Sequence, residues 1–206
     1  MATYKTEQEK FWSGEFGDGY VDRNFSEKQV VGRVVHFARF LQSAVGIKSI
    51  LELGCNVGMN LQALKRLNPD FDLAAYEINP KAAGIARDLG IAKVTTGTVV
   101  EPVEESRTYD LTFTSGVLIH INPQSLNGVY ENLHRLSSRY ILVNEYYNPT
   151  PVTVEYRGAM DKLFKRDFAG ELIDKFDLRL IDYGFLYRRD NYFPRDDSNW
   201  FLLEKK

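Results

Sequence analysis

One stretch of this chain decides its fold: Ile50-Leu51-Glu52-Leu53-Gly54-Cys55-Asn56-Val57-Gly58-Met59-Asn60-Leu61. Its first part, within residues 49–53, is a short apolar run that predicts a buried strand, and residues 58–67 have the spacing of a helix. The glycines at positions 54 and 58 let the backbone pass close to a ligand. At the start of such a helix, free amide hydrogens and the helix dipole favour a carboxylate or a phosphate. The stretch therefore predicts a strand, a glycine turn and a helix that bind a small ligand mainly through backbone groups.

The same alternation of strands and helices continues on both sides of this turn. An amphipathic helix is predicted over 27–45, with Ser26 as its N-cap. Pro80 is expected to open a later helix that stops at Gly90. The other elements up to residue 145 are predicted as strands over 71–76, 92–95, 109–115 and 140–145, and as helices over 80–89 and 123–136. Strands that alternate with helices predict a parallel sheet covered on both faces.

The last third of the chain departs from this alternation. A helix is predicted over 167–176, but the strand-like runs 178–187 and 199–203 are separated only by a loop, so they are expected to pair antiparallel. The predicted fold class is α/β, a three-layer sandwich around a mostly parallel seven-stranded sheet with an antiparallel C-terminal pair. This is typical of Rossmann-like methyltransferases, whereas a dinucleotide dehydrogenase usually continues with another crossover helix.

Length and composition favour one domain. The chain has 206 residues, 44% of them hydrophobic, which is enough for one substantial core but not for two domains and a linker. Residues 1–27 are rich in turn formers and show no clear period, so they are interpreted as an N-terminal flap. Residues 28–206 are interpreted as a Rossmann-like core with C-terminal acceptor-site elements.

The charge and cysteine content exclude several classes of partner. There are 26 basic and 28 acidic residues, and the net charge of -2 argues against nucleic acid or an anionic membrane as a partner. Cys55 is the only cysteine, so no internal disulfide forms and a reducing compartment is expected. No stretch resembles a signal peptide or approaches the roughly 20 apolar residues that span a bilayer. A cytoplasmic protein is therefore predicted.

The residues around the glycine turn narrow the class of ligand. A dinucleotide fingerprint needs glycines spaced G-x-G-x-x-G, but Asn56 and Met59 occupy the second and third positions. Asparagine can still adopt a left-handed turn. Glu77, 23 residues after Gly54, stands where a carboxylate accepts hydrogen bonds from ribose hydroxyls. Together with Glu52, it favours an adenosyl ligand that carries a positive sulfonium and ammonium over a pyrophosphate.

These features resemble the class I S-adenosylmethionine-dependent methyltransferases over most of the chain. The resemblance implies that the turn wraps the methionine and ribose, that Glu77 binds the ribose, that residues 97–100 cover the adenine, and that the end of the fourth strand faces the donor methyl. Asn56 departs from the family's commoner glycine. The expected residues of the S-adenosyl-L-methionine site are Trp12, Tyr20, Arg23, Glu52, Gly54, Cys55, Asn56, Gly58, Asn60, Glu77, Ile78, Thr98, Val99, Ser115, Gly116 and Val117.

Within that class, the chain resembles the methyltransferases associated with pseudaminic acid biosynthesis. The resemblance rests mainly on residues 8–20, 116–123 and 139–149, which read QEKFWSGEFGDGY, GVLIHINP and RYILVNEYYNP. Residues 162–168 and 183–185 also fit. Ala159 is a departure, because that group is expected to have a histidine there. The resemblance implies a pathway more directly than it implies an acceptor.

Two residues are candidates for catalysis, His120 and Tyr146. His120 follows the fourth strand, where it either takes a proton from the acceptor or packs on the cofactor. Tyr146 ends the fifth strand at the same edge of the sheet, where it either lines the acceptor pocket or packs as a strand end. His36 and His134 lie on predicted helices, and structural roles are favoured for both.

A basic cluster outside the alternating core predicts an acceptor with a carboxylate or phosphate, or else a solvated face. The cluster comprises Arg157, Lys165, Arg166, Arg188 and Arg189. The expected acceptor-binding residues are Glu145, Tyr147, Arg157, Arg166 and Arg188. In the flap, Trp12, Tyr20, Arg23 and Asn24 are expected to close over the methionine, or to remain a solvated arm. No histidine or cysteine cluster has metal-ligand spacing, so no metal is predicted.

The sequence therefore predicts a methyltransferase (EC 2.1.1.-) that acts on an oxygen or nitrogen of a small polar acceptor. The resemblance implies a nonulosonic (pseudaminic) acid sugar, its precursor or its substituent, which makes the acceptor an anionic sugar. A non-catalytic S-adenosylmethionine-binding module and a nucleotide-dependent oxidoreductase remain alternatives. The sequence leaves the oligomeric state open.

Overall fold

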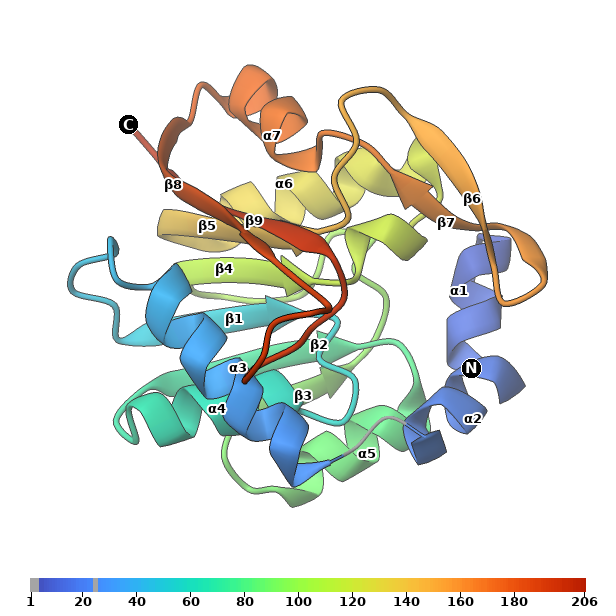
Figure 1. The fold of residues 1–206 in the computed structure, drawn as a ribbon, viewed down its shortest axis with the longest axis horizontal. Coiled ribbons are helices and arrows are strands. Elements are labelled where there is room, and N and C mark those ends of the chain that lie inside the picture. Colours follow the sequence, from blue (N-terminus) through green and yellow to red (C-terminus); the bar gives the residue numbers. More distant parts are fainter. Residues whose placement is uncertain (1–3, 24–25) are drawn as a thin grey trace.

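The computed structural model describes residues 4–23 and 26–206, without the side chains of Asp22 and Arg23. At its centre is a seven-stranded sheet in the order β3-β2-β1-β4-β5-β9-β8 (Figure 1). Its strands are β1 (Ser49–Leu53), β2 (Asp72–Glu77), β3 (Lys93–Thr96), β4 (Tyr109–Ser115), β5 (Ser137–Glu145), β8 (Arg179–Leu186) and β9 (Ser198–Glu204). The first five run parallel, and β9 runs antiparallel to both β5 and β8. The predicted mostly parallel sheet with an antiparallel C-terminal pair is confirmed.

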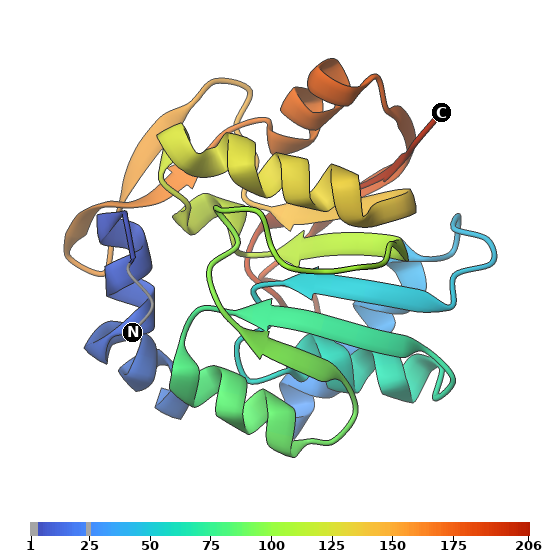
Figure 2. The same ribbon diagram turned by 180° about the vertical axis from the view of Figure 1, so that it is seen from behind.

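Helices cover both faces of the sheet (Figures 1 and 2). On one face lie α3 (Glu27–Phe40), α4 (Met59–Leu67) and α5 (Pro80–Asp88). On the other face lie α6 (Leu126–Leu136) and α7 (Phe168–Phe176). This arrangement is the predicted three-layer sandwich, and it leaves the carboxyl ends of the parallel strands open at one edge.

The sheet separates two apolar cores. Successive side chains of a strand point to opposite faces, so Ile50 packs in the core beneath α3, α4 and α5, whereas Leu51 packs in the core beneath α6 and α7. Both side chains are fully buried. Phe37 of α3 meets Phe113 of β4 edge to face, with ring centroids 5.3 Å apart. Burying each side chain of this size contributes about 1.5–3 kcal/mol to the stability of the fold. Because the central strands are covered on both faces, they consist of nearly continuous apolar runs.

The helix starts follow the local sequence closely. Ser26 caps α3 as predicted, and its hydroxyl accepts from the amide of Gln29. Asn79 caps α5, whose first residue is Pro80. The predicted helix over 27–45 ends earlier, at Phe40, and the predicted helix over 123–136 begins with a 3₁₀ turn, Pro123–Ser125, before α6. A second 3₁₀ turn, Leu118–His120, precedes it.

The N-terminal arm, residues 4–23, lies within the segment that the sequence predicts as a flap without a clear period. It forms two helices, α1 (Glu7–Ser13) and α2 (Glu15–Arg23), with a corner at Gly14. A capping box opens α1, because Thr6 accepts from the amide of Glu9 and the Glu9 carboxylate accepts from the amide of Thr6. The helices are too short and too rich in aromatic and glycine residues to show a period, so their packing stabilises them. The sequence-based prediction of an N-terminal flap did not include these two helices.

A small hairpin is also absent from the sequence-based prediction. It consists of β6 (Val152–Tyr156) and β7 (Ala159–Lys165), which pair antiparallel as a separate two-stranded sheet. Both turn residues have positive φ, 50° at Arg157 and 80° at Gly158. Gly158 suits such a turn, but Arg157 gives no sequence signal for it. The hairpin lies beside α1, and the side chain of Gln8 donates to the carbonyl of Asp161 (Figure 1).

The cysteine, the apolar character of the helices and the metal-ligating side chains are the remaining features that bear on function. Cys55 is a free, buried cysteine. Among the described residues, none of the helices has both the length and the apolar character needed to cross a membrane. No group of histidine, cysteine, aspartate and glutamate side chains in residues 4–23 and 26–206 is arranged to hold a metal ion.

Candidate active site

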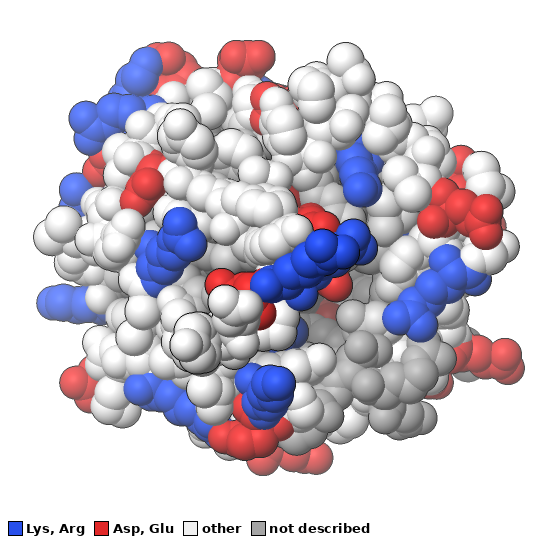
Figure 3. All heavy atoms as spheres, in the orientation of Figure 1, with Lys and Arg blue, Asp and Glu red and all other residues white. Residues whose placement is uncertain are grey.

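A cavity of about 910 Å³ opens at the carboxyl ends of the parallel strands. Its walls come from the loops after β1, β2, β3, β4 and β5, from the N-terminal arm, from α3 and from the loop between β8 and β9. Figure 3 shows a hollow near the middle of this face, with basic and acidic side chains gathered around it. This is the position where open α/β sheets bind ligands.

The glycine turn after β1 forms the floor of the cavity. Three of its five residues have positive φ: 86° at Gly54, 48° at Asn56 and 79° at Gly58. Asn56 therefore adopts the left-handed turn that the sequence allows it. A Cβ on Gly54 would lie 2.5 Å from Cγ2 of Val117, so the turn packs directly against the loop after β4. The turn needs glycine at 54 for both its conformation and its packing.

Glu77, at the end of β2, is fixed against this turn. Its Oε2 accepts from the amide of Asn56 at 2.7 Å, and its Oε1 accepts from the amide of Asn79 at 2.8 Å. Burial raises the pKa of the carboxyl, and the backbone hydrogen bonds oppose that rise. Glu77 lines the cavity, and an ionised carboxylate has further lone pairs for a ligand.

Glu52 lies beneath the cavity wall instead of lining it. It is fully buried, and its Oε1 accepts from Nδ2 of Asn60 at 2.6 Å. Burial raises its pKa to about 8. Asn60 in turn accepts from Nε of Arg33 at 3.0 Å. Glu52 therefore orients Asn60, and through it Arg33, which both line the cavity.

The loop after β3 connects the cavity to the N-terminal arm. The hydroxyl of Thr98 donates to Glu9 of α1 at 2.5 Å, and Val99 is buried beside it. A Cβ on Gly128 of α6 would lie 1.9 Å from the carbonyl oxygen of Val100, so α6 holds this loop from below. The loop is thereby braced on two sides.

The loop after β4 is organised by Glu145. Its Oε1 accepts from the amide of Val117 at 3.0 Å and its Oε2 from the amide of Ile119 at 3.4 Å. Burial raises the pKa of this carboxyl to about 7. Gly116, with φ of 72°, donates its amide to the carbonyl of Asn144. Glu145 lines the cavity, but its oxygens hold the loop backbone, which differs from the predicted contact with an acceptor.

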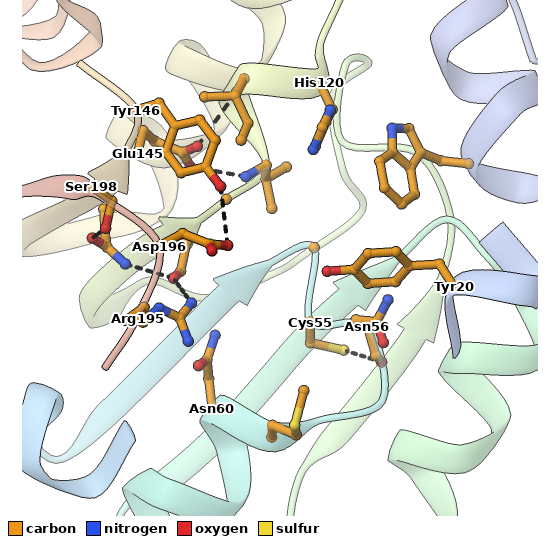
Figure 4. A pocket seen from close by; sticks show the side chains of 18 of the residues that line it. Tyr20, Cys55, Asn56, Asn60, His120, Glu145, Tyr146, Arg195, Asp196 and Ser198 are labelled. Carbon is orange, nitrogen blue, oxygen red and sulfur yellow. Dashed lines mark hydrogen bonds between the residues drawn. The ribbon is translucent and has the colours of Figure 1, made fainter. Parts of the chain in front are cut away.

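His120 follows this loop, and its ring points into the cavity (Figure 4). Its Nδ1 lies 2.7 Å from the carbonyl oxygen of Lys162. Because a carbonyl only accepts, Nδ1 carries the proton and Nε2 keeps its lone pair. Burial lowers the pKa of the ring to about 4, so it is neutral at neutral pH. The ring packs between Trp12 and Tyr156, with centroids 4.6 and 5.0 Å away.

Tyr146 follows β5, the strand next to β4, and its ring also points into the cavity (Figure 4). Its hydroxyl donates to Oδ2 of Asp196 at 3.1 Å. Burial raises the pKa of the phenol, and Asp196 adds to the rise. The neighbouring Arg195 donates to the hydroxyl of Ser115 at 3.3 Å.

Most residues predicted for the cofactor site line this one cavity. They are Trp12, Tyr20, Gly54, Cys55, Asn56, Asn60, Glu77, Ile78, Thr98, Val99, Ser115, Gly116 and Val117. Gly58 instead caps α4, where a Cβ would lie 2.9 Å from Cδ1 of Leu89. The side chain of Arg23 and residue Asn24 lie outside the described part of the chain.

The predicted acceptor residues are divided. Arg188 lines the cavity mouth beside Asp197, at 3.4 Å. Three others lie elsewhere. Arg166 pairs with Glu171 at 2.6 Å outside the cavity, Arg157 sits in the β6–β7 turn, and the half-exposed Tyr147 packs near Phe201. Their place at a strand end or in a basic cluster suggested the site, but the direction of each side chain is decided by tertiary packing. These three residues therefore do not line the cavity in which they were predicted to contact an acceptor.

Sequence reasoning missed several residues that line the cavity, namely Arg33, Tyr156, Arg195 and Asp196. Arg33 interrupts the apolar face of the predicted helix, which is a signal that was present. Arg195 and Asp196 stand in an irregular loop, so no period marks them. Tyr156 reaches the site through the unpredicted hairpin.

Comparison with known proteins finds the same fold. No family model and no curated protein matches the sequence. The magnesium protoporphyrin IX methyltransferase from Synechocystis PCC 6803, with bound S-adenosylmethionine, superposes with a TM-score of 0.68 at 12% identity, covering 100% of each chain. The N-methyltransferase NodS from Bradyrhizobium japonicum WM9 superposes with a TM-score of 0.65 at 12% identity, covering 87% of this chain and 98% of that one. This chain has the Rossmann-like methyltransferase fold.

A third solved structure adds the same likeness. It is the O-methyltransferase of a trans-AT polyketide synthase multienzyme from Brevibacillus brevis, in complex with S-adenosyl-L-homocysteine. Its TM-score is 0.64 at 14% identity, and the match covers 89% of this chain and 80% of that one. The methyltransferase fold therefore extends over most of the present chain.

Proposed function

We propose that this chain is an S-adenosylmethionine-dependent methyltransferase that transfers a methyl group to an oxygen or nitrogen of a small polar acceptor. The observation that carries the proposal is the cavity floor, where the turn of Gly54 and Asn56 meets the Glu77 carboxylate at the carboxyl ends of β1 and β2. The solved relatives of the same fold that hold S-adenosylmethionine or S-adenosylhomocysteine support it.

The cavity has the groups that this donor requires. The free lone pairs of Glu77 suit two ribose hydroxyls, and the loop with Thr98 and Val99 suits the adenine. Arg33, held by Asn60, provides a cation for the methionine carboxylate. When bound, S-adenosylmethionine would supply an electrophilic methyl carbon that an acceptor nucleophile attacks in line, with S-adenosylhomocysteine as the leaving group. The remaining work of the protein is to align the acceptor, exclude water and receive a proton.

His120 is the group best placed to receive that proton. Its Nδ1–H is held by the carbonyl of Lys162, which leaves the Nε2 lone pair available and fixes the plane of the ring. The acceptor proton becomes acidic as the new bond forms, so a neutral imidazole takes it even with a lowered pKa. Tyr146, held by Asp196, presents its oxygen to the same cavity and helps orient an acceptor hydroxyl or amine.

For the acceptor, the resemblance to the pseudaminic acid-associated methyltransferases leads us to propose a nonulosonic acid sugar, its precursor or its substituent. A reducing, cytoplasmic setting and a single functional domain over 1–206 are part of the same proposal. An NAD-dependent oxidoreductase is disfavoured, because Asn56 and Met59 replace two of the glycines that a pyrophosphate requires.

Calorimetric titration with S-adenosylhomocysteine tests the donor site, with NAD(H) as the control ligand. Saturable micromolar binding of the former alone is the expected result, and binding of NAD(H) alone or of neither ligand would refute the proposal. Release of S-adenosylhomocysteine during incubation with a panel of nonulosonic acids then tests turnover. Tight donor binding without turnover on any acceptor would favour a non-catalytic binding module.

The role of His120 is tested by His120→Ala. The variant is expected to lower turnover about 100-fold or more while the affinity for S-adenosylhomocysteine stays the same, because the base contributes to proton transfer and not to donor binding. An unchanged rate would show that His120 only packs against Trp12 and Tyr156.

A further inference from the structure

Two arginines from neighbouring segments reach the cavity. Arg33 comes from α3, and Arg195 comes from the loop between β8 and β9. Both side chains are half-buried. Among the ion pairs of the described residues, neither arginine has a carboxylate partner. The nearby Asp196 accepts instead from the hydroxyl of Tyr146.

This arrangement favours the binding of anions in the cavity. Burial and the neighbouring Arg195 lower the pKa of Arg33 to about 9, and burial lowers the pKa of Arg195 as well. The nearby carboxylates Asp196 and Glu52 oppose these shifts, but among the described residues neither forms a direct ion pair with the arginines. Two partly desolvated guanidinium groups in one cavity repel each other, and burying them without a paired anion is costly. A ligand with negative groups at both positions would relieve both costs.

The hydrogen bonds of the two arginines assign them to different parts of the cavity. Arg33 donates to Asn60 and to the carbonyl of Gln29, which places it beside the start of α4 and the donor's glycine turn. Arg195 donates to Ser115 at the end of β4 and lies between Asn60 and the Tyr146–Asp196 pair (Figure 4). A guanidinium has five N–H donors. Among the described residues, the guanidinium of Arg195 donates only to the hydroxyl of Ser115.

The proposed donor has a single carboxylate, for which Arg33 suffices. We infer that Arg195, held by Ser115, binds a carboxylate or phosphate of the methyl acceptor and so selects anionic acceptors. This inference rests on the proposed function. It moves the recognition of the anion from Arg157 and Arg166, which lie outside the cavity, to a residue inside it, beside Tyr146. A planar guanidinium with several free donors can hold either anion with two parallel hydrogen bonds.

The test separates the two arginines with two probes. S-adenosylhomocysteine is titrated calorimetrically into the protein, and inorganic phosphate is then titrated into the saturated complex at constant ionic strength. The variants are Arg195→Gln, Arg33→Gln and the control Arg39→Gln, which changes an exposed arginine of α3 outside the cavity.

We expect Arg195→Gln to weaken phosphate binding at least 10-fold and to change the affinity for S-adenosylhomocysteine less than 3-fold. Arg33→Gln is expected to do the reverse, and Arg39→Gln to change neither. The inference is overturned if the saturated wild-type complex binds no phosphate saturably, if Arg195→Gln binds phosphate as the wild type does, or if that variant loses S-adenosylhomocysteine binding instead. Failure of the wild type to bind S-adenosylhomocysteine at all would refute the proposed function, which is a separate result.

Discussion

The two halves of the cavity are built differently. The half that we propose for the donor, called the donor half, consists of backbone turns at the ends of β1 and β2, with Glu77 as its main side chain. The half that we propose for the acceptor, called the acceptor half, consists of side chains from segments far apart in the sequence, such as His120, Tyr146 and Arg195. A backbone site is fixed as soon as the sheet forms, whereas a side-chain site depends on how several loops pack. The donor half should therefore fail through conformation, and the acceptor half through loss of single contacts.

The largest effect is expected where the donor half depends on a glycine. Gly54→Ala forces a side chain into a positive φ and against Val117, so we expect the free energy of unfolding to fall by about 2–5 kcal/mol. Gly46→Ala is the matched control, because Gly46 has a φ of 77° but no atom within 4 Å of an added Cβ, and it should cost about 1–2 kcal/mol. Urea unfolding measures both, and equal losses would show that packing against Val117 is unimportant.

The acceptor half makes stability depend on pH through His120. Its pKa falls from 6.5 to about 4 in the folded chain, so between these values the unfolded chain binds more protons. The free energy of unfolding should rise from pH 4 to pH 6.5 and then level off. His120→Asn should remove about 3 kcal/mol of this rise. His134→Asn, at a half-buried ring, is the control and should remove less. An identical pH profile for His120→Asn and the wild type would contradict the burial of a neutral ring.

The donor half is tested directly at Glu77. Glu77→Gln removes a charged acceptor, so the affinity for S-adenosylhomocysteine should fall about 10- to 100-fold, measured by calorimetry. Glu101→Gln, at an exposed residue paired with Lys5, is the control and should leave the affinity unchanged. If Glu77→Gln binds as tightly as the wild type, the ribose contact lies elsewhere.

The smallest effect is expected where the N-terminal arm contacts β7 and the loop after β4. Gln8 donates to the carbonyl of Asp161 and accepts from Asn122, so Gln8→Ala should loosen α1 by about 1 kcal/mol. Hydrogen exchange of α1 amides should quicken about 5-fold, while exchange in β1 stays unchanged. Lys10→Ala, at an exposed pair with Glu7, should change neither. Equal acceleration in β1 would mean that the arm and the sheet open together.

The strands and helices between residues 49 and 145 were predictable because each is determined mainly by residues close together in the sequence. The strands over 49–53 and 109–115 match β1 and β4 at both ends, and Ser26 caps its helix as predicted. The antiparallel pair followed because only a loop, with no crossover helix, connects its two strands. In each case a period, a cap or a loop length acts over a few residues, so it can be seen in the sequence.

The arm and the hairpin were not predictable in the same way. Helix α1 is held by Thr98 and Asp161, which come from other parts of the chain. The hairpin turn has an arginine at positive φ, which local preference disfavours. Contacts between distant segments stabilise both elements, and such contacts produce no hydrophobic periodicity in the sequence.

The sequence by itself determined the α/β sheet, the glycine turn between β1 and α4, and the position of Glu77 at the end of β2, because each depends on neighbours in the chain. Only the tertiary structure decided that Arg33 and Arg195 share one cavity, that Arg166 lies outside it, and that Glu145 supports a loop. The physical reason is that side-chain direction and burial depend on packing between segments, which spacing along the chain does not specify.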